Sequence, residues 1–276
     1  MAKTKVVQNS RTRRHDPTTL GRNFKRRLRA GEVMLGGSVS EYLRPSLAKI
    51  YAQAGYDFVY VDKEHMFFDG AEMTDFILAA RDNQLPVVSK IGELNRSETA
   101  RLLEAGAVGI QLPRSESRAQ LEQLISFMKF PPYGTRAGAP CYGNVDYAWP
   151  ADDRGWLRKA DESTAVVVHI ETALGYENAE EIVSTPQVDM VYVGPYDFSI
   201  AMGEPGNYDH PQVRKPMLEI LRLCKKHGVA FGTSASSPQR GLEWIAKGCQ
   251  FFELATEQGL IINGAAELVR AYGAGK

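Results

Sequence analysis

Eight short runs rich in β-branched and aromatic residues recur along this chain, and amphipathic stretches separate them. Several of the runs are apolar on both faces, which is typical of parallel strands covered by helices. Alternating strands and helices restrict the chain to an α/β fold with a parallel sheet. The eight expected strands are residues 34–38, 57–62, 86–91, 108–112, 165–171, 189–194, 229–233 and 250–254.

The stretches between the strands carry apolar residues at helical spacing. Two stripes follow the pattern of a helix that buries one face, and a looser third stripe lies near the C-terminus. Their residues are Leu121, Leu124, Ile125 and Met128; Val213, Met217, Ile220, Leu221 and Cys224; and Ile261, Leu268 and Tyr272. Four helical stretches end just before a strand at a glycine, which tolerates the left-handed conformation: Gly55, Gly106, Gly228 and Gly248.

Eight strand–helix units in a chain of 276 residues favour a single-domain (β/α)8 TIM barrel over residues 23–276. The alternative is an open, doubly wound sheet, which needs a glycine-rich phosphate turn after its first strand. Residues 35–38, Leu-Gly-Gly-Ser, match the GxGxxG pattern too poorly to support it. One long interruption, residues 130–163, breaks the alternation, and a loop of this length in a barrel is usually functional.

The positive charge is concentrated at the N-terminus. Residues 1–29 carry a net charge of +9, and the rest of the chain carries −9. We interpret residues 1–22 as a basic, flexible extension, followed by a short helix over 23–30 with a basic outer face. An arm that binds nucleic acid is the alternative, but no aromatic residue lies among the arginines before Phe24 to stack on a base.

The overall composition excludes several classes of protein. The net charge is +0, so no global field attracts the chain to nucleic acid or to an anionic membrane. No apolar run approaches the roughly 18 residues that span a bilayer, and the N-terminus has no secretory signal pattern. The three cysteines are scattered and read as reduced thiols. We expect a cytoplasmic protein whose partners are small molecules.

Polar side chains gather where the expected strands end. In a barrel of this kind, the carboxyl ends of the strands form one rim, and the active site lies there. The candidates at this rim are Asp62, Glu64, His65, Lys90, Arg114, His169, Glu171, Gly194, Tyr196 and Asp197.

Glu171 and Asp197 follow neighbouring strands, so their carboxylates can converge. Two carboxylates with open positions are typical of sites that hold Mg²⁺ or Mn²⁺, in which substrate and water complete the shell. His65 can act as a general base, because its ordinary pKa of about 6.5 lies near neutral pH. The alternatives are ordinary ones: a helix cap or a salt bridge for each acid, and a structural role for the histidine.

The segment Val-Asp-Lys-Glu-His at 61–65 resembles the D-x-E-H signature of the HpcH/HpaI aldolase family. Four further matches follow in the same order and spacing, at 103–106, 130–136, 170–172 and 194–199. The resemblance extends from about Asn23 to the C-terminus. It implies a class II pyruvate aldolase on a barrel of the phosphoenolpyruvate/pyruvate type, with a hexamer built as a trimer of dimers.

The resemblance also implies roles for residues. Glu171 and Asp197 would bind a divalent metal ion, Mg²⁺, Mn²⁺ or Co²⁺, and His65 would move the proton. Backbone groups around Tyr196, with Gly194, would hold the substrate carboxylate. The metal would stabilise the enolate that forms when 4-hydroxy-2-oxo acids are cleaved to an aldehyde and pyruvate or hydroxypyruvate. Asp62 would support catalysis, and Glu64 would contact the substrate.

Three positions depart from the family pattern. Lys90 stands where the family usually has an arginine at the enolate, Glu104 replaces the aspartate that partners the base, and His169 replaces a glutamine. We expect Lys90 and Glu104 to act in catalysis and His169 in substrate binding. Lys90 could instead form a Schiff base or a structural salt bridge. Arg114 and Arg136 are candidates for binding the far end of the substrate, or are ordinary ion-pair residues.

Two other functions remain open at this stage. A related carbon–carbon lyase, synthase or decarboxylase that acts on an oxaloacetate-like keto acid would use the same metal-stabilised enolate. A barrel that only binds a keto acid is a third hypothesis. The presence together of His65, Glu171 and Asp197 argues against a barrel that has lost its chemistry.

Overall fold

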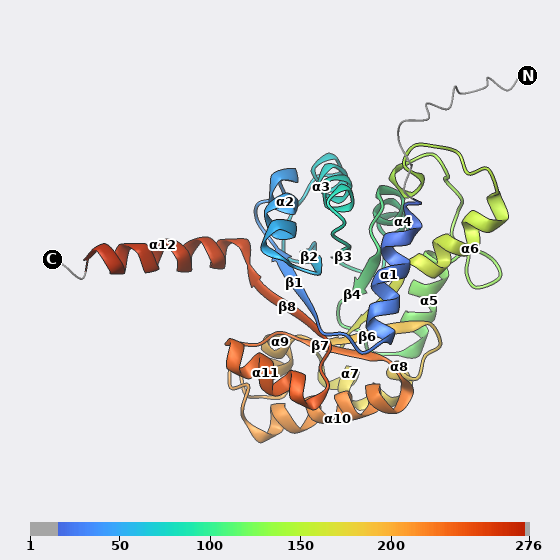
Figure 1. The fold of residues 1–276 in the computed structure, drawn as a ribbon. Coiled ribbons are helices and arrows are strands. Elements are labelled where there is room, and N and C mark those ends of the chain that lie inside the picture. Colours follow the sequence, from blue (N-terminus) through green and yellow to red (C-terminus); the bar gives the residue numbers. More distant parts are fainter. Residues whose placement is uncertain (1–15, 274–276) are drawn as a thin grey trace, which may run out of the picture.

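A computed structural model describes residues 16–273, and these residues form a closed barrel of eight parallel strands (Figure 1). Each strand pairs with the next, and β8 pairs with β1. The expected TIM barrel is therefore confirmed, and the strands differ from the expected ranges by at most two residues at either end. The strands are β1 (Met34–Val39), β2 (Phe58–Asp62), β3 (Val87–Lys90), β4 (Gly109–Leu112), β5 (Ala165–His169), β6 (Val188–Val193), β7 (Ala230–Thr233) and β8 (Phe251–Thr256).

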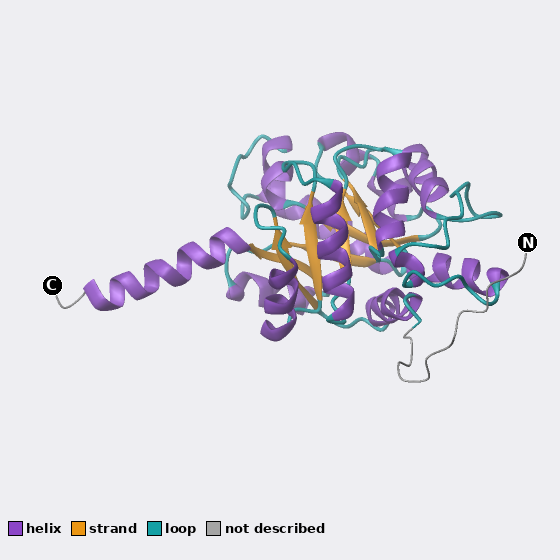
Figure 2. Ribbon diagram, turned by 90° about the horizontal axis from the view of Figure 1, so that it is seen from above, coloured by secondary structure: helices purple, strands orange, loops and turns teal. Residues whose placement is uncertain are grey.

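Helices surround the barrel, and most of them follow a strand (Figure 2). They are α1 (Thr18–Arg29), α2 (Pro45–Ala54), α3 (Gly70–Asp82), α4 (Arg96–Ala105), α5 (Arg118–Met128), α6 (Asp153–Ser163), α7 (Ala173–Glu177), α8 (Ala179–Val183), α9 (Pro195–Ala201), α10 (Pro211–His227), α11 (Pro238–Lys247) and α12 (Glu257–Gly273). The two clear apolar stripes are buried on α5 and α10. The four expected glycines end α2, α4, α10 and α11 in the left-handed conformation. Within residues 16–273, no helix is both long and apolar enough to cross a membrane.

Side chains alternate along each strand between two separate cores. Val59 and Val61 of β2 face the helices and belong to the outer core. Phe58 and Tyr60 of the same strand point into the barrel interior. Because successive strand residues face opposite sides, this alternation assigns every strand residue to the interior or to the helix layer.

Helix α1 closes the end of the barrel that lies opposite the carboxyl ends of the strands. Its Phe24 ring lies 5.9 Å from the ring of Phe58 and 6.4 Å from that of Phe251, each the first residue of its strand. The helix begins at Thr18, five residues before the expected start, so the expected boundary between residues 22 and 23 falls inside it. The physical reason is packing: Gly21 lies directly against the backbone of Ser163 on α6. Residues 1–15, most of the expected extension, lie outside the described residues.

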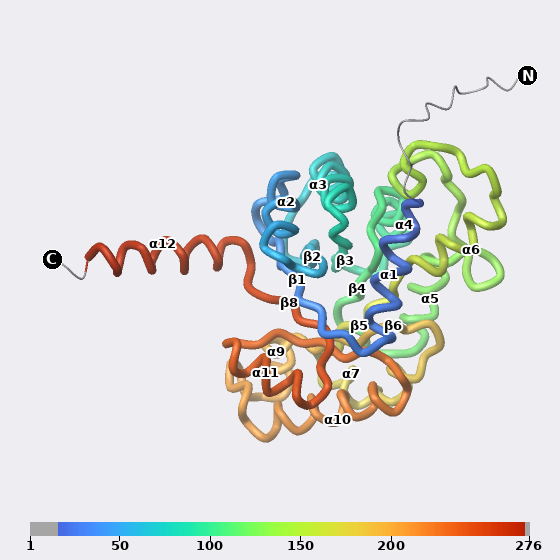
Figure 3. The backbone as a smooth tube through the Cα atoms, viewed as in Figure 1, coloured from blue at the N-terminus to red at the C-terminus, as the bar shows by residue number. Residues whose placement is uncertain are grey.

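The expected long interruption is present, but only its first part is irregular. The chain leaves α5 and forms a loop with one short 3-10 helix, η1 (Gly143–Val145), before α6 begins (Figure 3). A small satellite core of Phe130, Val145, Trp156 and Ala160 holds the loop to α6. The loop is therefore packed in place on the outside of the barrel.

The last helix, α12, projects away from the barrel in two perpendicular views (Figures 1 and 2). Every residue from 260 to 273 is exposed. The C-terminal stripe expected to be buried is therefore solvent-exposed in the single chain, with Ile261, Leu268 and Tyr272 exposed by 60%, 62% and 84%. A helix packs its apolar face only where a partner surface exists, and one chain offers none here.

A substitution at Gly21 tests whether α1 is part of the folded barrel. A Cβ atom at this position would lie 2.0 Å from the Ser163 carbonyl oxygen, which is backbone and cannot rotate away. We expect Gly21→Ala to destabilise the protein by about 1–3 kcal/mol in chemical unfolding. Gly70→Ala is the matched control, because Gly70 is the exposed first residue of α3 and has no atom within 4 Å of its Cβ position. Equal effects at both glycines would contradict the packing of α1.

Candidate active site

A cavity of about 610 Å³ opens at the carboxyl ends of the strands. Seven of the residues expected at the site line it, from β2 and the turn after it, β3, β5, the end of β6 and the start of α9. The expected residues that line it are Asp62, His65, Lys90, His169, Gly194, Tyr196 and Asp197. The position of the cavity agrees with the rule that barrel enzymes place their chemistry at this rim.

The turn after β2 is organised by its aspartate. Asp62 Oδ1 accepts hydrogen bonds from the backbone nitrogens of Glu64, at 2.8 Å, and His65, at 3.1 Å. This leaves the His65 imidazole exposed at the cavity, with Nε2 3.6 Å from Glu64 Oε2. Asp62 thus fixes the turn that holds the His65 and Glu64 side chains next to each other.

Lys90 is a buried cation on the cavity wall. Its side chain is only 3% exposed, and its Nζ forms an ion pair with Glu64. Burial alone disfavours the charged amino group, but the surrounding carboxylates, led by Glu171 and Glu64, outweigh burial and raise the pKa of Lys90. The amino group is therefore held as an ammonium ion at neutral pH.

Glu171 lies two residues beyond the end of β5, is 4% exposed and is not among the residues that line the cavity. One carboxylate oxygen accepts a hydrogen bond of 2.7 Å from the backbone nitrogen of Arg114. The other lies 3.1 Å from His169 Nε2 without hydrogen-bond geometry, and both ring nitrogens of His169 are buried without a partner. Arg114 adopts a positive φ of 46°, which turns its backbone nitrogen toward Glu171.

The carboxylates around Glu171 repel one another. Burial raises the pKa of Glu171 to about 7, and the negative charges of Glu64 and Asp197 add to that rise, against the opposing effect of Lys90. Within residues 16–273, no group of three or more His, Cys, Asp or Glu side chains forms a complete metal site. Two acidic side chains that repel one another, beside the buried ring nitrogens of His169, have a chemistry that fits a divalent cation.

The loop from β6 to α9 approaches the cavity closely. A Cβ atom at Gly194 would lie 2.4 Å from His169 Nε2, so only glycine fits between β6 and this ring. Pro195 starts α9, and Asp197 lies in the first turn of that helix. The backbone at Gly194 thus sets the distance between His169 and the residues at the start of α9.

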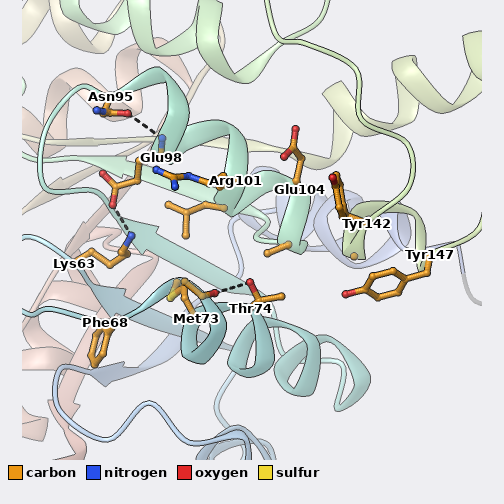
Figure 4. Close-up of a pocket in the computed structure, with 14 residues that line it drawn as sticks. Lys63, Phe68, Met73, Thr74, Asn95, Glu98, Arg101, Glu104, Tyr142 and Tyr147 are labelled. Carbon is orange, nitrogen blue, oxygen red and sulfur yellow. Dashed lines mark hydrogen bonds and ion pairs between the residues drawn. The ribbon is translucent and has the colours of Figure 1, made fainter.

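Glu104 and the two arginines do not reach this cavity within one chain. Glu104 lies on α4 and lines a second cavity of about 540 Å³, outside the barrel, between α3, α4 and the long loop (Figure 4). The Arg114 side chain is exposed beside Glu116, and only its backbone contacts the site. Arg136 is 6% exposed and lies over the ring of Phe130. The long loop likewise lines the second cavity, with Tyr142 and Tyr147, and contributes nothing to the first.

The interior below the cavity contains polar residues that the strand-end rule does not identify. Tyr60, Gln111, Tyr192 and Glu253 lie on β2, β4, β6 and β8, and all four are buried. The signal for them was present in the sequence, because each is a polar or hydroxyl-bearing residue between two apolar residues of a strand. Such a residue points opposite to its neighbours, and therefore into the barrel.

A scan of the chain against protein families matches residues 40–264 to HpcH/HpaI aldolase/citrate lyase. The match covers most of the chain, so this protein belongs to the HpcH/HpaI aldolase/citrate lyase family, a family of carbon–carbon lyases.

Three curated relatives illustrate the likeness. A hydroxypyruvate/pyruvate aldolase of Pseudomonas aeruginosa is 29% identical over 91% of this chain and 93% of its own length. The 2-keto-3-deoxy-L-rhamnonate aldolase of Escherichia coli K12 is 26% identical, over 93% and 95%. A 2-dehydro-3,6-dideoxy-6-sulfogluconate aldolase of Pseudomonas putida is 27% identical, over 82% and 88%.

Solved structures agree with this assignment. An HpcH/HpaI aldolase from Desulfitobacterium hafniense DCB-2 superposes with a TM-score of 0.85 at 25% identity, covering 90% of this chain and 95% of its own. The citrate synthase SbnG gives a TM-score of 0.81 at 25% identity, covering 91% and 98%. The citrate lyase β subunit of M. tuberculosis was solved with oxaloacetate and magnesium. It is 20% identical and superposes with a TM-score of 0.54, covering 83% of this chain and 93% of its own. This likeness shows a shared fold.

Proposed function

We propose that this protein is a class II aldolase that reversibly cleaves 4-hydroxy-2-oxo acids into an aldehyde and a pyruvate-type keto acid. The observation that carries the proposal is the meeting of a buried cation, Lys90, with the acids Glu64 and Glu171 at the rim of the barrel. Family membership and the three aldolase relatives support the same reaction class.

In this proposal, Glu171 and Asp197 would hold a divalent metal ion, which would supply Lewis-acid stabilisation of the enolate. Lys90 places a fixed positive charge where the enolate develops, in a site from which most water is excluded. His65, exposed at the cavity mouth, removes the proton from the substrate hydroxyl, and Glu64 orients both His65 and Lys90. His169 stacks edge-on against Tyr192, next to Glu171.

A reaction on an oxaloacetate-like keto acid is the second candidate. It is favoured by the likeness to the citrate synthase SbnG, which covers 91% of this chain. The same enolate would serve both reactions, so the residues above keep their roles. Release of CO₂ from oxaloacetate, compared with release of pyruvate from 4-hydroxy-2-oxo acids, separates the two.

Removal of either acidic ligand tests the proposed function. We expect Glu171→Gln and Asp197→Asn each to reduce pyruvate release at least about 100-fold, because the transition-state charge loses its stabilisation. Chelation should inactivate the wild type, and added Mg²⁺, Mn²⁺ or Co²⁺ should restore it. A spectrophotometric assay of pyruvate, together with thermal unfolding to verify the fold, is the measurement. Full activity of both variants after chelation would contradict the metal-dependent mechanism.

Substitutions of Lys90 test whether this residue acts as a cation or as a covalent nucleophile. A Schiff base requires a neutral amine, and the carboxylates around Lys90 favour the ammonium form. We expect Lys90→Met to lose about 100-fold in kcat/KM, whereas Lys90→Arg keeps a measurable part of it. Borohydride added with pyruvate should leave the protein mass unchanged. A stable adduct on Lys90, in an enzyme that survives chelation, would establish the Schiff-base mechanism instead.

We further propose that the protein assembles as a homo-oligomer through α12, in line with the hexamer that the family resemblance implies. This helix follows β8, yet it leaves the eighth helix position on its own barrel uncovered (Figure 3). The helices α2 and α11 follow the two strands that flank β8, and they expose Ile50 and Leu242 by 59% and 64%. The start of α12 is held firmly, because the buried Glu257 carboxylate accepts backbone hydrogen bonds from Ser40, Glu41 and Tyr42. A second copy of α12 would cover the open position.

Light scattering tests this assembly. We expect the mass of the wild-type particle to be a multiple of 30.6 kDa. The double variant Leu268→Asp, Val269→Asp should form smaller species, because it places two charges in an apolar interface. Arg270→Ala, a substitution of a charged residue on the same helix, is the control and should keep the wild-type mass. A wild-type protein that is monomeric at micromolar concentration would contradict the proposal.

A further inference from the structure

One complete layer of the barrel interior is built from polar and hydroxyl-bearing side chains. Strand pairing sets Ser38 beside Tyr60, Lys90 beside Gln111, and His169 beside Tyr192. The even strands β2, β4, β6 and β8 therefore contribute Tyr60, Gln111, Tyr192 and Glu253, and the odd strands contribute Ser38, Lys90 and His169 beside three of them. Barrel interiors usually fill such a layer with branched apolar residues, so this layer, called here the polar floor, requires an explanation.

Apolar packing ends directly beneath the polar floor. Phe251 stacks on Phe58 with ring centroids 4.1 Å apart, and the edge of Tyr192 approaches Phe251 at 6.5 Å. Above, the floor is open, because Tyr60, Tyr192 and Glu253 line the candidate active-site cavity. Any group that the polar floor binds therefore arrives from the cavity.

The polar floor carries hydrogen-bonding atoms without partners. Gln111 is 0% exposed; it lies close enough to the Glu253 carboxyl to lower the pKa of that group, but neither its Nε2 nor its Oε1 has a partner at full hydrogen-bond geometry. Glu253 is 6% exposed, and its Oε1 is also unpartnered. Leaving such buried groups unpaired costs about 1–3 kcal/mol for each group, so they are expected to meet a ligand group or ordered water when the site is in use.

We propose that the polar floor is a subsite for a hydroxyl group on C3 of the keto-acid donor, and that it makes the enzyme prefer a hydroxylated donor over pyruvate. The inference rests on the proposed aldolase function. The donor must lie deepest, because Lys90 and Glu171, the groups that stabilise its enolate, are the buried ones, whereas the aldehyde leaves through the open mouth. In this proposal the C3 hydroxyl meets Glu253, which lines the cavity, and Gln111 lies next to Glu253 in the polar floor.

The charge of the polar floor is compatible with an anionic donor. Burial raises the pKa of Glu253 to about 8; the nearby Tyr192, Lys90 and Gln111 oppose the rise, and Asp62 adds to it. Burial also raises the pKa of Tyr60 and of Tyr192 well above the ordinary value. At neutral pH, Glu253 is mostly a neutral acid that can donate a hydrogen bond without repelling the substrate. Pyruvate, which offers only a methyl group, would leave the floor unpaired.

Hydrogen exchange at C3 tests the subsite without an aldehyde. Each donor, pyruvate or hydroxypyruvate, is incubated in D₂O with the metal-loaded enzyme, and NMR follows replacement of C3 protons by solvent deuterons. We expect the wild type to exchange hydroxypyruvate at least about tenfold faster, relative to each donor's uncatalysed rate, than pyruvate. Gln111→Leu and Glu253→Leu should each reduce that ratio about tenfold, the effect of one hydrogen bond. Glu253→Gln should retain part of it.

Tyr142→Phe in the second cavity is the control and should keep the wild-type ratio. A wild type that exchanges pyruvate as fast as hydroxypyruvate, or leucine variants that fold and keep the preference, would overturn the subsite. Exchange of neither donor would instead contradict the proposed aldolase function. In that case, calorimetric titration of the metal-loaded protein with each keto acid tests whether the subsite exists. Tighter binding of hydroxypyruvate than of pyruvate, lost in Gln111→Leu, would support the subsite. Equal binding of the two keto acids would refute it.

Discussion

Closure of eight parallel strands puts every second side chain into one interior that the surrounding helices do not reach. The chain fills this space in two ways. At the end closed by α1, aromatic rings pack on one another, as Phe58 does on Phe251. Toward the carboxyl ends, the same inward positions carry Lys90, His169 and Glu253. Barrel closure thus confines charged groups where water is scarce, and their electrostatic interactions are strong there.

The charges in this confined region do not balance within the protein. Lys90 is a buried cation, and it faces carboxylates on every side, with Glu64 in contact and Glu171 and Asp62 close enough to raise its pKa. Burial and the charges of Glu64 and Asp197 in turn raise the pKa of Glu171 to about 7. A buried acid that resists ionisation is unfavourable for a purely structural salt bridge and suits a site completed by a divalent cation.

The sequence predicts the strand ends because β-branched runs and helix-ending glycines are local signals. That is why the positions of all eight strands are confirmed, and why Lys90 and Asp197, expected at the rim, line the cavity there. The start of α1 was misjudged because a basic, polar segment reads as solvated, whereas the deciding contact, Gly21 against Ser163, joins residues far apart in the chain. Glu104 was expected at the site on family resemblance, but one chain places it on α4 beside another cavity.

Glu253 and the helix α12 each depart from the usual rule that charged residues lie at the surface and apolar residues in the interior. Glu253 is a charged residue type in the middle of an apolar strand, and α12 is an apolar helix with its stripe in solvent. Each costs free energy in the isolated chain, through an unpartnered buried carboxyl oxygen or through exposed apolar area. A natural sequence retains such costs where a partner outside the chain offsets them. In our proposals, that partner is the keto-acid donor for Glu253 and a second copy of the protein for α12.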